Sequence, residues 1–128
     1  MRNFNEHQES LDALIASTAA YTAATNTAAT NTAATHTAAT LILQFGDESC
    51  APCHAIRHKL DAWLANHPDV AARYIDIQTH LALCSQMGIM SAPTVIVYMD
   101  GKIVAREAGY FSLDDMLCRV ERYMEMRG

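Results

Sequence analysis

Basic residues and long apolar runs are both scarce in this sequence. Lysine and arginine number 9 against 14 aspartates and glutamates, and the resulting net charge of −5 argues against nucleic acid or an anionic membrane surface as partner. No run approaches the roughly 18 apolar residues of a membrane-spanning helix. The first ten residues are polar and acidic and lack the apolar stretch of a signal peptide. We therefore expect a cytoplasmic protein that binds neither membranes nor nucleic acid.

Cysteine is also sparse, with four residues in a chain of 128. A chain of this length falls in the common range of a single domain, roughly 100–150 residues, and can bury a core of ordinary size. In the cytosol, four cysteines are more often reduced, catalytic or metal-bound than part of a structural framework. Two of them, Cys50 and Cys53, lie only two residues apart, which makes this stretch the first candidate for chemistry.

Residues 22–40 contain no charged, aromatic or large aliphatic residue. They repeat the unit Thr-Ala-Ala-Thr followed by Asn or His, with a period of five. Such a period matches neither the 3.6 residues of a helical turn nor the alternation of a strand, so no apolar face can form. We predict a weakly packed insert at about residues 19–40 of a single domain spanning 1–128, helical at most to about Ala33 and extended on its return.

Outside the repeat, the sequence alternates between helical and strand patterns. Apolar residues at helical spacing indicate helices, and β-branched runs indicate strands. Asp100-Gly101 is typical of a hairpin turn. The order of elements predicts an α/β fold with a mixed sheet of about four strands and helices on both faces. The expected helices lie at about 9–16, 51–66, 79–87 and from 112 onward, and the strands at 41–45, within 70–77, at 94–99 and at 102–108.

The two closely spaced cysteines follow the apolar run Leu41–Phe45 and open a helical pattern. A thiol at a helix N-terminus faces unpaired backbone N–H groups and the positive end of the helix dipole. Both favour the thiolate, which is the reactive form of cysteine. Pro52 suits the first helical turn because no N–H is needed there. A C-x-x-C motif directly after a strand is therefore a redox signal.

The same residues leave other interpretations open. Cys50, Cys53 and His54 also satisfy the C-x-x-C-H pattern of haem attachment. With His54 or His58, the two cysteines could ligate zinc or an iron–sulfur centre. No second C-x-x-C or spaced Cys/His pair is present to supply the remaining ligands.

Further motifs follow the cysteines: Gly88-Ile-Met-Ser-Ala-Pro-Thr94, the Asp100-Gly101 turn, and Gly109 before the last helix. Together with the strand and C-x-x-C, they make the chain resemble the thioredoxin family over residues 41–126 and, more loosely, over residues 1–18. The resemblance implies a thioredoxin-like fold with a CAPC active site, in which Ala51 and Pro52 separate the cysteines. It also implies a cis Pro93 beside the cysteines, with the backbone at Ala92 placed to pair with an extended substrate.

Three positions depart from the family pattern. Ser49 stands where the family commonly has tryptophan, and Tyr74 stands where it often has lysine. Gln44 occupies the place of a buried aspartate that helps to deprotonate the second thiol. Because an amide cannot act as a base, we expect slow resolution of a mixed disulfide near neutral pH.

The resemblance implies a thiol–disulfide oxidoreductase that reduces protein disulfides. Cys50 would attack the substrate disulfide and Cys53 would resolve the mixed disulfide. The expected electron source is NADPH through a thioredoxin reductase, with no bound cofactor and a monomeric protein. The alternative is a non-catalytic thioredoxin-like binding module. Of the other cysteines, we expect Cys84 to be buried and inert and Cys118 to be exposed.

Overall fold

The computed structural model describes residues 1–24 and 38–127. Within them, a five-stranded sheet in the order β1-β3-β2-β4-β5 carries helices on both faces. The α/β architecture with a mixed sheet agrees with the sequence prediction. The elements are β1 Arg2–Asn3, α1 Leu11–Ala24, β2 Thr40–Gly46, α2 Ala51–Ala65, β3 Val70–Asp76, α3 Leu81–Gln86, β4 Thr94–Met99, β5 Lys102–Ala108 and α4 Leu113–Arg127.

The strand count differs from the expected four because of the short edge strand β1. Its two residues pair in parallel with Arg73 and Tyr74 of β3. Two residues are too few to show strand periodicity, and the polar Arg2–Asn3 carries no β-branched signal. The other pairings follow the element order, with β2 parallel to β3, and with β2–β4 and β4–β5 antiparallel.

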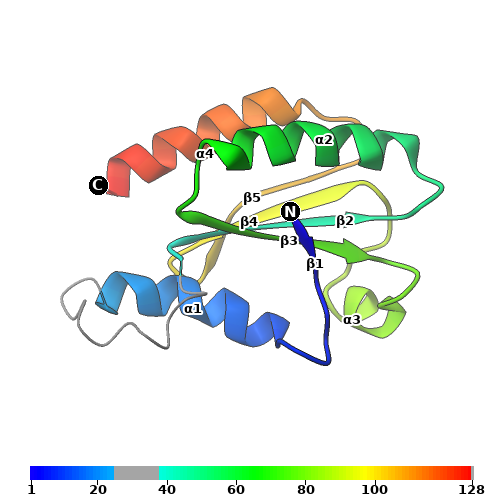
Figure 1. The fold of residues 1–128 in the computed structure, drawn as a ribbon, viewed down its shortest axis with the longest axis horizontal. Helices are drawn as coiled ribbons and strands as arrows, with labels where there is room; N and C mark the ends of the chain where they lie inside the picture. The colour runs from blue at the N-terminus through cyan, green and yellow to red at the C-terminus, as the bar shows by residue number, and fades with distance from the viewer. Residues whose placement is uncertain (25–37, 128) are drawn as a thin grey trace.

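The helices form two layers, with α2 and α4 on one face of the sheet and α1 and α3 on the other (Figure 1). Side chains along a strand point to alternate faces, so the central strand β2 serves both layers. Ile42 contributes to the core beneath α2 and α4, whereas Leu41, Leu43 and Phe45 contribute to the core beneath α1 and α3. Every residue of β2 is buried, which is why its sequence reads as a continuous apolar run.

Helix α1 packs on the sheet through Leu11, Leu14 and Ile15, which lie on one face at helical spacing. The Ser10 side chain caps it by accepting the Ala13 N–H at 3.3 Å. The helix continues to Ala24, and β2 begins at Thr40, so both ends of the predicted insert belong to regular elements. The predicted turning point of the repeat near Ala33 lies outside the described residues.

A side-chain hydroxyl ties α1 to the β4–β5 hairpin. Thr18 is 1% exposed, and its Oγ1 accepts a 2.6 Å hydrogen bond from the Gly101 backbone N–H. The neighbouring Ser17 hydroxyl bonds only locally, to the Leu14 carbonyl. Because Gly101 is 83 residues away in sequence, this hydrogen bond fixes the far end of α1 against the sheet.

A buried arginine joins the N-terminal segment to β3. Arg73 is 7% exposed, and its Nε donates to both carboxylate oxygens of Glu9 at 3.1 Å. Burial raises the pKa of Glu9, but the hydrogen bond and charge of Arg73, with help from Asn5 and Arg2, outweigh burial and hold this pKa below its ordinary value. The carboxylate therefore stays charged and paired at neutral pH.

Helix α4 begins with a side-chain cap. The Ser112 hydroxyl accepts the Asp115 N–H at 3.1 Å. Cys118 lies on the exposed side of α4 and Cys84 is buried at 1% exposure, so the predicted exposure of the one and burial of the other are confirmed. The apolar stripe of Leu113, Met116, Leu117 and Val120 is buried against the sheet.

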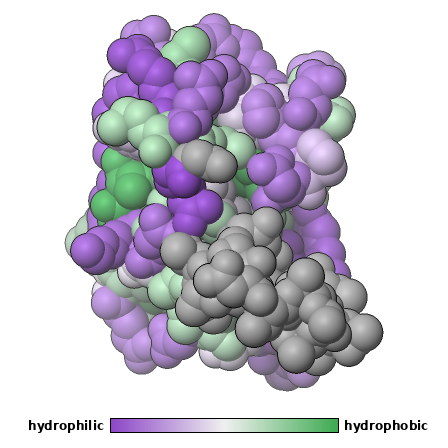
Figure 2. All heavy atoms as spheres, turned by 90° about the vertical axis from the view of Figure 1, so that its left-hand side faces the viewer, coloured by the Kyte–Doolittle hydropathy of each residue, from purple (hydrophilic) through white to green (hydrophobic). Residues whose placement is uncertain are grey.

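Figure 2 faces the end opposite the start of α2, and the coloured surface there is largely hydrophilic, with hydrophobic residues in small groups. Among the described helices, none combines the length and the apolar character that crossing a bilayer requires.

Candidate active site

The register of the sheet gathers three loops at the end where α2 begins. Phe45 pairs with Thr94, and Thr94 pairs with Ala108. The end of β2, the start of β4 and the end of β5 therefore lie at the same end of the sheet. The loop after β2 therefore lies beside the loop before β4 and the loop after β5. These loops carry the C-x-x-C motif, Pro93 and Gly109, which the sequence had singled out separately.

Cys50 is the N-cap residue of α2 and forms a disulfide with Cys53. The Cys50 sulfur accepts the Cys53 backbone N–H at 3.2 Å, so it lies at the positive end of the helix. Cys50 is half-buried, whereas Cys53 is fully buried at 0% exposure. Ala51 and Pro52 between them are exposed. An attacking group from outside can reach only the Cys50 side of the disulfide without displacing the helix.

The turn before Cys50 is held by Asp47. Its Oδ1 accepts the Ser49 N–H at 2.9 Å and the Ser49 hydroxyl at 3.0 Å. Its backbone carbonyl accepts the Cys50 N–H at 3.1 Å. The N–H and hydroxyl of Ser49 lower the pKa of Asp47 below its ordinary value. Ser49, in the place of the family's tryptophan, thus serves as a hydrogen-bonding partner within the turn.

The peptide bond between Ala92 and Pro93 is cis, as the resemblance implied. Pro93 is buried and Ala92 is half-exposed. The Pro93 carbonyl accepts the Gly109 N–H at 2.9 Å, which joins the loop before β4 to the loop after β5. Gly109 has φ of +75°, a conformation that glycine adopts without strain.

Two large apolar side chains stand exposed on these loops. Met90 is 90% exposed in the loop before β4, and Tyr110 is 101% exposed in the loop after β5. Both loops lie at the same end of the sheet as Cys50. The full exposure of Tyr110 excludes its packing onto the edge of the sheet.

Gln44 lies beneath the first turn of α2. It is 0% exposed, and its Nε2 donates to the Cys53 carbonyl at 2.8 Å. Its Oε1 is buried without a hydrogen-bond partner among the described residues. The structure therefore brings the predicted support residue into contact with the second cysteine, with one half of its amide unpaired.

Tyr74 and Arg57 form a stacked pair beside this site. The Arg57 guanidinium carbon lies 4.3 Å from the centroid of the Tyr74 ring, a cation–π arrangement. Arg57 also donates to the Met1 carbonyl and to Asn3 Oδ1, at 2.8 and 3.0 Å. Burial raises the pKa of Tyr74, and the nearby Arg57 partly offsets this effect. The sequence did not single out Arg57, because its partners at the N-terminus are more than fifty residues away.

A polar cavity of about 370 Å³ lies beside α2, between residues that flank the cysteine motif and the end of β3. His54 lines it and lies 2.9 Å from the Glu48 carbonyl through Nε2. In the described part of the chain, no three His, Cys, Asp or Glu side chains come together as a metal site would require. The structure therefore brings no additional ligand to the cysteines and His54 from the residues it describes.

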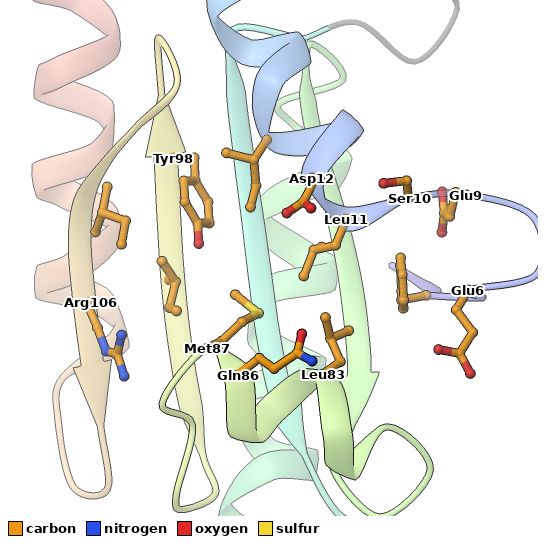
Figure 3. Close-up of a pocket in the computed structure, with 14 residues that line it drawn as sticks. Glu6, Glu9, Ser10, Leu11, Asp12, Leu83, Gln86, Met87, Tyr98 and Arg106 are labelled. Atoms are coloured by element: carbon orange, nitrogen blue, oxygen red, sulfur yellow. The ribbon is translucent and has the colours of Figure 1, made fainter.

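A second cavity, of about 640 Å³, lies on the other face of the sheet, between α1 and α3 (Figure 3). Leu11 and Leu83 approach it from the two helices, and the Tyr98 ring points into it from β4. Among the described residues its lining contains no cysteine, and from the three loops around Cys50 it includes only Met87, at the start of the loop before β4. This cavity is therefore separate from the candidate active site.

Comparison with known proteins gives the family of the chain. A family model described as a thioredoxin-like domain matches residues 27–123. The thioredoxin of Chlamydia muridarum is 30% identical over 83 residues, which make up 65% of this chain and 81% of that protein.

Two solved thioredoxins share its fold. Thioredoxin 1 of Thermosipho africanus superposes with a TM-score of 0.63 at 26% identity, covering 68% of this chain and 97% of that one. A mutant thioredoxin of Halobacterium salinarum superposes with a TM-score of 0.59 at 27% identity, covering 67% of this chain and 75% of that one.

The chain belongs to the family of thioredoxin-like domains. The fold, the relatives named thioredoxin and the disulfide between Cys50 and Cys53 together support thiol–disulfide oxidoreductase chemistry at this site.

Proposed function

We propose that this protein reduces disulfide bonds in other proteins by cycling Cys50 and Cys53 between a dithiol and a disulfide. The observation that carries the proposal is the unequal burial of two bonded cysteines at one helix start. Cys50 is accessible and Cys53 is fully buried. This difference in burial supports Cys50 as the sulfur that attacks the substrate and Cys53 as the sulfur that resolves the mixed disulfide.

The cycle starts from the reduced protein. The Cys50 thiolate attacks one sulfur of a substrate disulfide, forms a mixed disulfide and releases the other substrate sulfur as a thiolate, which takes up a proton. Cys53 then loses its proton and attacks the Cys50 sulfur, which releases the second substrate thiol. The substrate gains two electrons and two protons, and the protein is left with the Cys50–Cys53 disulfide.

The loops around the site would hold the substrate. An extended segment that pairs with the backbone at Ala92 would pass beside Cys50, because the registers of β2, β4 and β5 put both residues at the same end of the sheet. Met90 and Tyr110, exposed on the loops before β4 and after β5, offer apolar contacts to such a segment. This arrangement suits substrates whose disulfides lie in unfolded or loop segments, because such segments can reach Cys50 at this end of the sheet.

The disulfide formed in each turnover must be reduced again. The electron donor in this proposal is NADPH through a thioredoxin reductase, and the setting is a reducing compartment such as the cytoplasm. In this proposal the protein acts as a monomer. It needs no bound cofactor, because the two sulfurs carry both electrons.

Insulin reduction tests the proposal. With dithiothreitol as the reductant, the protein should accelerate precipitation of the insulin B chain, and with NADPH and a thioredoxin reductase it should consume NADPH. Cys50→Ser should abolish both signals. Cys118→Ser is the matched control, since it removes an exposed thiol that lies on α4 and outside the three loops of the site, and it should retain activity. Rates equal to those without protein would favour the non-catalytic binding module.

A further inference from the structure

The unpaired oxygen of Gln44 is the feature that the proposed cycle does not yet use. The large majority of buried side-chain polar atoms in proteins have a hydrogen-bond partner, so a fully buried amide oxygen without one needs an explanation. Leaving such an acceptor unpaired costs about 1–3 kcal/mol. No other buried side-chain atom of β2 is left unpaired in the described residues.

The position of this oxygen is constrained by the other half of the same amide. Nε2 donates to the Cys53 carbonyl at 2.8 Å, and Oε1 belongs to the same planar group. Oε1 is therefore held beside the first turn of α2, next to the residue whose sulfur is in the disulfide. In the disulfide, the Cys53 sulfur carries no hydrogen and has nothing to donate.

We propose that Gln44 is a positioning residue for the reduced state, in which its Oε1 accepts a hydrogen bond from the Cys53 thiol. Reduction by a dithiol breaks the S–S bond and transfers two electrons and two protons, and the dithiol becomes a disulfide. One of the protons creates the Cys53 S–H donor. The orphaned acceptor of the oxidised protein is thereby paired only after reduction.

Two consequences follow. Gln44 stabilises the dithiol relative to the disulfide, so it makes the protein a better acceptor of electrons than it would be with an apolar residue there. It also holds the proton on Cys53, so it slows the step in which Cys53 must become a thiolate to resolve the mixed disulfide. An aspartate at this position would act as a base and accept that proton. Glutamine at the same position can only accept a hydrogen bond from the thiol.

The redox equilibrium tests the first consequence. Gln44→Met keeps an unbranched side chain of similar length but has no amide. Its equilibrium constant with dithiothreitol or glutathione buffers should shift toward the disulfide by roughly tenfold, which corresponds to about 30 mV. Gln86→Met is the matched control, because Gln86 is exposed on α3 across the sheet, and its constant should stay within about twofold of the parent.

Infrared spectroscopy tests the hydrogen bond itself in the reduced parent protein, which keeps Gln44. The S–H stretching band of Cys53, assigned by its loss in Cys53→Ser, should lie at lower frequency than that of Cys84, which is buried in an apolar cluster. In Gln44→Met the Cys53 band should rise toward the Cys84 band.

This inference rests on the proposed function, but the two fail in different ways. A parent protein whose disulfide never equilibrates with the redox buffers would contradict the proposed function. A parent that equilibrates normally, while Gln44→Met leaves the constant unchanged and the two S–H bands coincide, would overturn the role of Gln44 alone. A bound water satisfying Oε1 in both redox states would give this second result.

Discussion

Gly46 provides a sharp test of how the site is packed, because the Tyr74 ring lies directly against it. A Cβ added at Gly46 would meet the Tyr74 hydroxyl, and would lie 2.8 Å from Cζ and 3.0 Å from Cε2 of the same ring. The ring has little room to move, since Arg57 stacks against it and is bonded in turn to β1.

We therefore expect Gly46→Ala to destabilise the protein by about 1–3 kcal/mol, the range for overpacking a close-packed site. Urea unfolding gives this free energy from the shift in midpoint at constant slope. Backbone strain does not contribute, because Gly46 is an extended β2 residue with no positive φ.

A double-mutant cycle isolates the contact with the ring. Tyr74→Val removes the ring but keeps a residue suited to a strand. In that background, Gly46→Ala should cost less than about 0.5 kcal/mol, as expected when two coupled sites lose their shared contact. An equal cost in both backgrounds would refute this account of the packing between β2 and β3.

Three further predictions concern the rest of the fold. Thr18→Val should cost about 1–3 kcal/mol, because it leaves the hairpin N–H unpaired, whereas Ser17→Ala should cost little; equal costs would contradict the tie between α1 and the hairpin. The depressed pKa of Glu9 gives stability that is present above its ordinary value of 4.5 and lost as the pH falls through the folded value. Glu9→Gln should therefore destabilise by about 1–3 kcal/mol at pH 7 and by much less at about pH 3, and a pH-independent difference would argue against the ion pair. In the native reduced protein, Cys118 should react with a thiol reagent much faster than Cys84, and equal rates would mean that α3 opens readily.

Much of this fold is legible in the sequence because it is specified locally. The buried run of β2, the helix after Cys50 and the hairpin at Asp100 each carry their own pattern within a few residues. Motif spacing and the family resemblance together predicted the order of the strands. From that order it followed that the loops with the cysteines, Pro93 and Gly109 lie at the same end of the sheet.

What the sequence did not reveal depends on contacts between distant residues. Strand β1 is recognisable only through its partner β3, and the Arg57–Tyr74 stack forms across two elements. Gln44 was identified as a departure from the family pattern. Which half of its amide is paired is a matter of side-chain geometry, and no pattern of residue types encodes it.

The most direct test of the central claim is to identify which sulfur forms the mixed disulfide. Reduced Cys53→Ser protein, incubated with an oxidised protein substrate, should accumulate a covalent complex that dithiothreitol releases, and mass spectrometry of its peptides should place the link at Cys50. Reduced Cys50→Ser should form no such complex, despite retaining Cys53, Cys84 and Cys118. A complex linked through any of these three cysteines, or no complex with Cys53→Ser, would contradict the assignment of Cys50 as the attacking thiol.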